Sequence, residues 1–520
     1  MLRSVSVENY RSFAQKATIE LRPITILLGR NSAGKSSLTR LFPLLRQSME
    51  RGTSAPILWN SSSVDFGRIT DVINRDHPNA PIRLTFDLCD QPLTSIGRSR
   101  PYMSPNAALP DVEADLKFTA VLRAGVDGKT HYEKIELMVG NDKIVFEFKI
   151  SGSLIYINDR KYEKNSYWKD LHLDSSRLFP YVLFESKKGE RVSEYPDTRD
   201  ELYSILQRLV DLSNESIPAP SQRARRQQPF IDLAHSPIMP LVSRPLLLKT
   251  LFDLPNFRGL ENVRPQDIDR LADLLLLTHC GALLEYIGSI VTPAMQNLSY
   301  LGPIRASGNR FYREQELSVD RIDDTGENLA TYLGSLSPHE LASFNNILRD
   351  AFGVEVRPHS EAGHLSIEIG RPGDEKYDNL ADVGFGYSQV LPLVAQIHSD
   401  TKRNRFIARQ RMTQILISAV EQPELHLHPA YQANLADLFV AAIEEAKRRG
   451  DTPIVILETH SEALISRIGE LISYGRLSTN DVAVHFVDKD DYIGGSTVRV
   501  AEFDEYGMIV NWPVGFFSAR

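Results

Sequence analysis

A phosphate-binding loop near the N-terminus constrains the fold of this chain more than any other feature. The apolar run Ile24–Leu28 continues directly into a segment with the spacing Gly-x-x-x-x-Gly-Lys-Ser. The residues of this loop are Gly29, Arg30, Asn31, Ser32, Ala33, Gly34, Lys35, Ser36 and Ser37. In such a loop the glycines turn backbone N–H groups toward phosphate oxygens, the lysine reaches the β- and γ-phosphates, and the serine hydroxyl holds Mg²⁺. The sequence therefore predicts a buried strand, a nucleotide-binding loop and a helix over Ser37–Arg46.

The composition is that of a soluble globular protein. Hydrophobic residues make up 42% of the 520 residues and charged residues 24%, and no segment approaches the roughly 18 apolar residues of a membrane span. The first ten residues alternate like a strand and lack the apolar core of a signal peptide. The two cysteines, Cys89 and Cys280, are too few for a disulfide framework. We therefore expect a cytoplasmic protein with no membrane partner.

The charge distribution gives little indication of nucleic-acid binding. A net charge of −8 provides no general attraction to DNA, so any contact would need a local basic patch. The best candidate is the group Arg223, Arg225 and Arg226. Because these arginines lack interleaved aromatic side chains, a solvated loop is the favoured interpretation. DNA therefore stays an open partner.

Strand-like and helix-like patterns divide the chain into three parts. Strand patterns lie at Leu2–Val7, Ala17–Leu28, Pro81–Leu88, Leu116–Leu122, His131–Val139, Lys143–Ile150 and Leu154–Ile157. Helical patterns follow at Asp200–Leu212 and Ile268–Ile290, and strands then alternate with helices after Tyr300. We predict an α/β fold with an N-terminal lobe at 1–160, an inserted and mainly helical domain at 161–299, and a C-terminal lobe at 300–520. The nucleotide fold would begin at the N-terminus and be completed only in the last third.

Two strands in the last third end in residues suited to phosphate chemistry. An apolar run from Ile415 leads into Glu421, and an acidic strand end is what a Mg²⁺-organising element requires. Glu421 and Ser36 are therefore the candidate metal residues. A second run, Ile454–Leu457, is followed by His460, and a histidine beyond the carboxyl end of a parallel strand lies in the ligand crevice.

These motifs together resemble ABC-type ATPases of the SMC, RecF and OLD group. The resemblance rests on the loop at 29–36, the turn Glu421-Gln422-Pro423-Glu424, the segment Leu427-His428-Pro429 and the triplet Thr459-His460-Ser461, and it covers residues 1–75 and 300–520. It implies an ATPase head assembled from both lobes, ATP and Mg²⁺ as cofactors, and a homodimer or higher oligomer with ATP sandwiched between heads. By the same resemblance, His460 would sense the γ-phosphate and Arg11 would contact adenine.

The family also uses a signature segment that reaches the γ-phosphate bound by the partner subunit. Residues 382–391 resemble a degenerate form of this segment, because the usual Leu-Ser-Gly-Gly core is absent and Gly384 occupies the serine position. Gly386 and Ser388 would be further contacts at a helix start, where backbone N–H groups can face an anion. A purely structural glycine turn is the alternative.

One departure from the family pattern bears on hydrolysis. The usual Asp-Glu pair at the end of the acidic strand is Glu421-Gln422 here, and an amide cannot act as a general base. General-base catalysis contributes about 10²- to 10⁴-fold. Unless Glu424 or a partner substitutes for the missing carboxylate, we expect slow hydrolysis and a long-lived ATP-bound form. The candidate catalytic residues are Glu421, Gln422, Glu424 and His460.

The resemblance favours a nucleotide-gated sensor or scaffold over a cutting enzyme. The chain is similar to the ATPase subunits of bacterial anti-phage systems, such as Septu-like and retron-associated modules. In such a system a separate effector nuclease would be the partner. A DNA-repair ATPase of RecF or SMC type is the first alternative. An autonomous OLD-like nuclease is disfavoured, because a Toprim domain needs more residues than follow His460, and Asp488 and Asp490 lie in what is predicted to be a terminal hairpin.

Overall fold

The computed structural model describes most of the chain outside the middle region. The described residues are 1–50, 52–92, 113–149, 152–162, 170–174, 176–185, 192–193, 265–314, 317, 319–407, 414–490 and 495–511. The basic group at Arg223 and the expected helix Asp200–Leu212 lie outside these residues.

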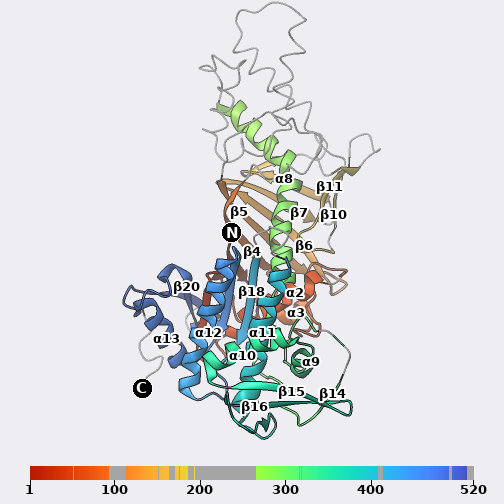
Figure 1. Ribbon diagram of the computed structural model, residues 1–520. Coiled ribbons are helices and arrows are strands. Elements are labelled where there is room, and N and C mark those ends of the chain that lie inside the picture. The colour runs from red at the N-terminus through yellow and green to blue at the C-terminus, as the bar shows by residue number, and fades with distance from the viewer. Residues whose placement is uncertain are drawn as a thin grey trace, which may run out of the picture.

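Strands from both ends of the chain form one seven-stranded sheet (Figure 1). Its order is β13 (Ser299–Leu301), β18 (Ile415–Glu421), β19 (Thr452–Glu458), β3 (Ile24–Gly29), β20 (Val482–Asp490), β21 (Gly495–Phe503) and β22 (Ile509–Val510). The first five strands are parallel, whereas β21 and β22 add in antiparallel fashion. The N-terminal strand β3 lies between two C-terminal strands. The predicted α/β fold, with a nucleotide fold shared by the two ends, is therefore confirmed.

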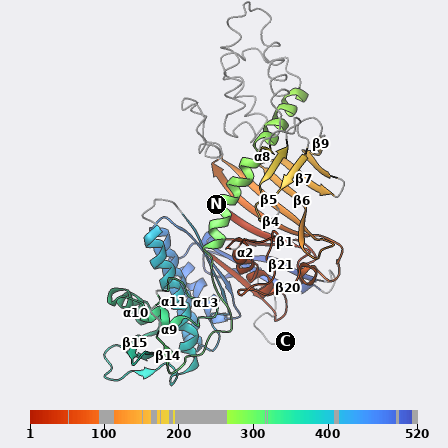
Figure 2. The same cartoon turned by 90° about the vertical axis from the view of Figure 1, so that its right-hand side faces the viewer.

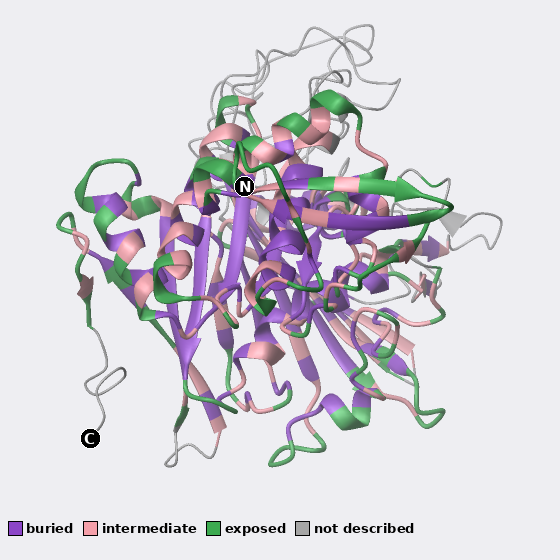
Figure 3. Cartoon of the chain, turned by 60° about the horizontal axis from the view of Figure 1, so that its bottom comes forward, coloured by how far each residue is buried: buried purple, intermediate pink, exposed green. Residues whose placement is uncertain are grey.

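Both faces of this sheet are buried. On β19, Ile454 and Ile456 belong to one hydrophobic core, and the alternate residues Val455 and Leu457 belong to another. This alternation follows from the two-residue period of a strand, and a parallel sheet is normally covered on both faces. Figure 3 shows the central strands mostly as buried residues. The helices on the two faces therefore hold the strand ends in fixed positions.

One face carries the C-terminal helices. They are α9 (Leu329–Gly334), α10 (Pro338–Phe352), α11 (Phe385–Ile407), α12 (Pro429–Arg448) and α13 (Glu462–Ser473). Ser461 caps α13, since its hydroxyl accepts a hydrogen bond from the Leu464 N–H at 3.0 Å. A small sheet of β14 (Tyr312–Arg313), β15 (Glu355–Glu361), β16 (His364–Gly370) and β17 (Asp378–Asn379) lies beside these helices (Figure 1).

The other face packs against an antiparallel lobe. Its eight strands run in the order β2 (Ala17–Glu20), β1 (Leu2–Glu8), β4 (Ile82–Pro92), β5 (Glu113–Ala124), β6 (Thr130–Val139), β7 (Asp142–Lys149), β8 (Gly152–Ile157) and β9 (Arg160–Tyr162). The long helix α8 (Pro265–Gln296) lies along this sheet (Figure 2). Its fully buried Asp273 accepts hydrogen bonds from Tyr162 at 2.9 Å and Arg160 at 3.1 Å, which fixes the helix to the β9 edge.

Two predicted elements are each divided in the structure. The expected strand Ala17–Leu28 is β2 followed by β3, and these strands belong to different sheets. The chain changes sheet at residues 21–23, where Pro23 lacks an N–H for a ladder hydrogen bond. The expected helix Ser37–Arg46 is divided into α1 (Lys35–Thr39) and α2 (Leu41–Glu50), with a short helix α3 (Ile69–Val72) further on. Arg40 lies at the break between α1 and α2.

The described part of 161–299 contains strands as well as helix. The short strands β10 (Asp170–Leu173), β11 (Val182–Glu185) and β12 (Val192–Ser193) form a separate sheet. The division into parts at 1–160, 161–299 and 300–520 stays a prediction. Within the described residues no single helix is long and apolar enough to cross a membrane, and only the two halves of α8, taken together as a bent pair, have the necessary length and composition.

Candidate nucleotide-binding site

The two glycines of the N-terminal loop lie where a side chain has no room. A Cβ on Gly29 would lie 2.0 Å from the Val487 carbonyl oxygen, because β20 passes directly beside the end of β3. Gly34 has φ +106°, a left-handed conformation that favours glycine, and a Cβ there would lie 2.5 Å from Ser12 Oγ. The turn from strand to helix therefore requires glycine at both positions, as the motif predicts.

Lys35 is held inside the loop that precedes it. Its Nζ donates hydrogen bonds to the carbonyls of Gly29 at 2.9 Å and Arg30 at 2.8 Å, and only 4% of the residue is exposed. Burial lowers the pKa of Lys35, and the charges of Glu458 and Glu424 partly oppose this effect. Arg30, Asn31 and Ser32 form the exposed tip of the loop, while Ala33 is buried. The lysine charge thus lies among residues from both ends of the chain.

A cavity of about 660 Å³ opens beside the loop. Its lining includes Ser32, Gly34, Lys35, Ser36 and Ser37 of the loop, Arg11 and Ser12 of the first turn, residues 71 and 73–76, and Lys489, Gly495 and Ser496 of the β20–β21 hairpin. The expected residue Arg11 therefore lines the same cavity as the loop. Its guanidinium carbon lies 4.7 Å from the centre of the Phe66 ring. The side-chain oxygens of Ser12 and Ser496 are buried without a hydrogen-bond partner among the described residues.

The carboxyl end of β19 contacts the helix that follows the loop. Glu458 accepts hydrogen bonds from Ser36 Oγ at 2.6 Å and Thr39 Oγ1 at 3.0 Å. Only 2% of Glu458 is exposed. Burial raises the pKa of its carboxyl group, and the neighbouring charge of Glu421 raises it further. The hydroxyl that would hold Mg²⁺ is thus bonded to an acidic residue of the C-terminal lobe.

The carboxyl end of β18 is bonded to different groups. Glu421, 1% exposed, accepts two hydrogen bonds from Arg40, at 2.8 Å from Nε and 2.9 Å from Nη2. The Tyr300 hydroxyl donates a third at 2.6 Å. The bidentate hydrogen bond to Glu421 raises the pKa of Arg40, and burial raises the pKa of Tyr300. The predicted metal residue is thus engaged by an arginine that the sequence analysis did not consider.

The turn after β18 carries the other predicted catalytic residues. Gln422 adopts a left-handed backbone conformation, φ +45°, and its N–H donates to the Glu458 carbonyl at 2.7 Å. Glu424 Oε1 accepts the backbone N–H of His460 at 2.6 Å, whereas Oε2 is buried without a hydrogen-bond partner among the described residues. Burial lowers the pKa of His460, and the charge of Lys35 lowers it further. Lys35 and His460, from opposite ends of the chain, thus share one electrostatic environment.

The predicted signature segment lies at the start of α11. Gly384 is exposed with open space around its Cβ position, and Gly386 packs against the carbonyl of His426, 3.2 Å from a Cβ placed there. Ser388 is 4% exposed, and its hydroxyl donates to the Phe385 carbonyl at 2.7 Å. The two glycines are thus placed at an accessible helix start, while the serine hydroxyl is engaged within its own helix.

Arg305 connects these elements. Its guanidinium donates to the carbonyl of Glu421 at 2.9 Å and to that of Gln389 in α11 at 3.2 Å. Burial lowers the pKa of Arg305 to about 10. The residue therefore joins the end of β18 to the start of α11, a role that could not be assigned from the sequence.

Sequence reasoning missed Glu458 and Arg40. Glu458 is the last residue of β19 and pairs in register with Glu421 of β18. Since the carboxyl ends of parallel strands meet at one edge, an acidic residue at each of two strand ends was the available signal. Arg40 carried no such signal, because its place depends on the break between α1 and α2.

Asp488 of the predicted terminal hairpin is bonded to its own hairpin in the described structure. Asp488 accepts the Lys489 N–H at 2.9 Å and lies 3.9 Å from Arg499. Across the described residues, no group of three or more His, Cys, Asp or Glu side chains could hold a metal ion.

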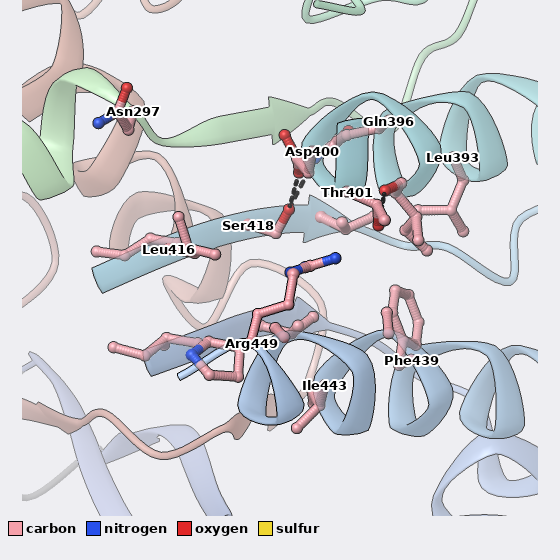
Figure 4. A pocket seen from close by; sticks show the side chains of 18 residues that line it. Asn297, Leu393, Gln396, Asp400, Thr401, Leu416, Ser418, Phe439, Ile443 and Arg449 are labelled. Atoms are coloured by element: carbon pink, nitrogen blue, oxygen red, sulfur yellow. Dashed lines mark hydrogen bonds between the residues drawn. The ribbon is translucent and has the colours of Figure 1, made fainter. Parts of the chain in front are cut away.

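A second cavity, of about 60 Å³, lies between α11, α12 and the central sheet (Figure 4). Leu393, Leu416, Phe439 and Ile443 line much of it, and Ser418 donates to Asp400 at 3.2 Å on one side. None of the loop residues 29–37 lines this cavity. The nucleotide candidate is therefore the larger cavity.

A protein-family comparison agrees with this geometry. The family described as AAA ATPase domain matches residues 1–217 and 287–465, which is more than half of the chain. The chain belongs to this family. Its matched segments include the loop, the ends of β18 and β19, and His460. Residues 477–518 match a second family, described as Protein of unknown function (DUF3696). These residues include the β20–β21 hairpin, which forms part of the cavity wall.

Solved structures that match the chain include heads of SMC proteins. One is the SMC head bound to the C-winged helix domain of ScpA, at 11% identity and a TM-score of 0.37, covering 97% of this chain and 98% of that chain. A second, derived from Pyrococcus furiosus, is an SMC head with an extended coiled coil bound to the C-terminal domain of ScpA, at 12% and 0.35, covering 96% of each chain. The SMC head from Thermotoga maritima matches at 10% and 0.31, covering 96% and 98%. No curated protein matches the chain.

Proposed function

We propose that this chain is an ATP-binding, slowly hydrolysing ATPase that works as a nucleotide-gated homodimer and controls a separate effector nuclease in bacterial anti-phage defence. The observation that carries the ATPase part is the convergence of Lys35 and Ser36 with Glu458 and His460, from the opposite end of the chain. Membership of the AAA ATPase domain family supports the same part. The defence setting and the effector rest on the motif resemblance.

The described residues fit a nucleoside triphosphate with Mg²⁺. The Lys35 ammonium group donates hydrogen bonds to two loop carbonyls, and phosphate oxygens would accept stronger, charge-assisted bonds from it. Ser12 and Ser496 line the same 660 Å³ cavity. The loop residues 29–37 would hold the phosphates, and Arg11 would lie toward the base. Mg²⁺ would be held by Ser36 and by a glutamate at the end of β18 or β19. The glutamate that the sequence predicts for this role is Glu421 of β18. The bound metal would neutralise charge on the phosphates.

Hydrolysis in this site would be slow, because no free carboxylate stands at the position of Gln422. An amide can orient a water molecule but cannot take its proton. Glu424 accepts the N–H of His460 with Oε1, and its Oε2 is buried away from solvent. His460, with its pKa below the ordinary 6.5, is neutral at neutral pH and can hydrogen-bond a phosphate without carrying charge. The ATP-bound form is therefore the long-lived state.

The surface around the start of α11 supports pairing of two copies. Phe385 is 50% exposed beside Gly384 and Gly386, and Ile304 and Phe311 are 83% and 60% exposed. The last two flank Arg305 and Arg310, which bond to Gln389 and Asp382 in the residues around this helix start. Exposed large apolar side chains near a ligand-binding element are a common mark of an interface. In the proposed dimer this surface would cover the ATP bound by the other copy.

The solution mass of the purified protein with and without ATP tests the gating. We expect a dimer with ATP and Mg²⁺, and a monomer without nucleotide or with Lys35→Ala. A mass that does not respond to ATP would contradict the gating. Pull-down from the native host should recover a nuclease. Strong stimulation of ATP turnover by DNA, with no co-purifying nuclease, would favour the repair ATPase instead.

A further inference from the structure

The acidic residues at the ends of β18 and β19 are neighbours in the sheet. Glu421 and Glu458 pair in register, so their Cα atoms lie about 4.8 Å apart. Both are almost fully buried. Two buried negative charges at this separation repel each other unless positive charge compensates them. Their different partners therefore indicate which of the two faces a cation.

Glu421 has its positive charge within the protein. The Arg40 guanidinium binds both carboxylate oxygens, and the Tyr300 hydroxyl binds one of them again. A two-pronged arginine bond is among the strongest pairings that a carboxylate makes. A metal ion could use Glu421 only after Arg40 had been displaced.

Glu458 has a different set of partners. In the described structure its carboxylate oxygens accept hydrogen bonds from two uncharged hydroxyls, Ser36 Oγ at 2.6 Å and Thr39 Oγ1 at 3.0 Å. The positive charge of Lys35 also acts on this carboxylate, but the Lys35 ammonium group donates its hydrogen bonds to the carbonyls of Gly29 and Arg30 instead. A hydroxyl has one proton and two acceptor sites. Ser36 donates its proton to Glu458, so both of its lone pairs remain available to a cation at the start of α1.

We propose that Glu458, together with Ser36, forms the Mg²⁺ site of this chain, and that Glu421 serves instead to anchor Arg40. This inference rests on the proposed ATP-binding function. Mg²⁺ at nucleotide sites is held by one or two carboxylates together with phosphate oxygens and waters, not by a protein cage. One carboxylate and one hydroxyl are therefore sufficient protein ligands. β19 is also the strand directly beside the loop strand β3, whereas β18 is one strand further away.

The test compares how far Mg²⁺ strengthens ATP binding in variants of the full chain. Calorimetric affinities for ATP, with Mg²⁺ and with a chelator, give the Mg²⁺ increment for wild type, Glu458→Gln and Glu421→Gln. We expect Glu458→Gln to reduce the increment about 10- to 100-fold, the usual effect of losing a group that organises a metal site. Binding in the chelator should not fall below the wild-type value, because Glu458→Gln removes a negative charge beside Lys35. Glu421→Gln should keep the increment.

Two control variants separate metal binding from general damage. Thr39→Val removes the other hydrogen bond to Glu458 but leaves its carboxylate, so the increment should persist. Glu470→Gln removes an exposed charge on α13 and should change nothing. If Glu458→Gln does not fold, Glu458→Asp keeps the charge on a shorter side chain, and we expect an increment below that of wild type.

Each outcome decides the inference. The inference would be overturned if Glu458→Gln kept the wild-type Mg²⁺ increment. If Glu458→Gln does not fold, a wild-type increment in folded Glu458→Asp would overturn it as well. Loss of the increment in Glu421→Gln alone would also overturn it. Failure of wild type to bind ATP at all would overturn the proposed function and this inference together. Wild-type ATP binding with an unchanged increment in Glu458→Gln would overturn only this inference.

Discussion

The ends of β18 and β19 lie side by side in one sheet and both finish in a buried glutamate, yet the two ends bond to different parts of the molecule. The β18 end binds Arg40 of the α1–α2 break, Tyr300 of β13 and Arg305 of the segment after β13. The β19 end binds the hydroxyls of Ser36 and Thr39 in the nucleotide loop helix. A strand-end carboxylate thus does not define a metal residue by position alone; its partners decide whether it supports the fold or faces a ligand.

Restoring a carboxylate after β18 should have the largest effect on this comparison. Gln422→Glu would supply the general base that this strand end lacks, so we expect ATP turnover at saturating Mg²⁺ and ATP to rise about 10²- to 10⁴-fold. Gln422→Asn keeps an amide and should leave turnover low. Equal turnover in Gln422→Glu and wild type would show that the end of β18 does not face the attacking water.

Removing the arginine at the β18 end should have the next largest effect. Arg40→Met would leave the charge of Glu421 buried without its main partner. Breaking a fully buried ion pair lowers the free energy of unfolding by about 3–5 kcal/mol. Because the Arg40 side chain is 39% exposed, we expect a smaller decrease, of about 2–3 kcal/mol. Urea unfolding measures this loss.

A matched pair elsewhere provides the comparison for Arg40→Met. Arg467 also makes a bidentate bond, to the carboxylate of Asp437, but both of these side chains are about one-third exposed. Exposed pairs contribute about 0–1 kcal/mol, so Arg467→Met should unfold close to wild type. Equal losses in the two variants would mean that the β18 end is not a buried anchor.

The smallest effect is a pH dependence at the β19 end. The pKa of Glu458 is raised in the folded protein, so its contribution to stability is present below the ordinary value of 4.5 and is lost as pH rises above it. In Mg²⁺-free solution, Glu458→Gln should therefore match wild type below pH 4.5 and gain relative stability above it. The glutamine side chain could lose one of the two hydrogen bonds that the Ser36 and Thr39 hydroxyls make to the Glu458 carboxylate. That loss would lower the free energy of unfolding by no more than about 1 kcal/mol.

Thermal unfolding across this pH range measures the difference between the two proteins. A Glu458→Gln variant that becomes less stable than wild type as pH rises would show that the β19 carboxylate is stabilised in place, like its neighbour at the β18 end.

The sequence predicted the parts of the site that follow from local pattern. The spacing of Gly29, Gly34 and Lys35 requires a particular turn, and the apolar runs before Glu421 and His460 predict strands whose ends meet at one edge. The exposed start of α11 at Gly384 was also placed at a helix start. These features depend on short segments and on the geometry of parallel sheets.

The features that were missed depend on contacts between distant segments. Arg40 lies where the expected single helix divides into α1 and α2, and no periodicity marks that division or the distant carboxylate of Glu421 that it binds. The register that pairs Glu458 with Glu421 requires the strand order, which the sequence does not supply. The change of sheet between β2 and β3 was hidden in the same way, since both segments have apolar strand patterns.

The most direct test of the central claim is the equilibrium affinity of the protein for ATP with Mg²⁺, measured for wild type and Lys35→Ala. The loop and the ends of β18 and β19 form one site in this account, so removing the Lys35 ammonium group, which would make charge-assisted hydrogen bonds to the phosphates, should weaken ATP binding about 100-fold or more. Equal affinity in the two proteins would contradict the account.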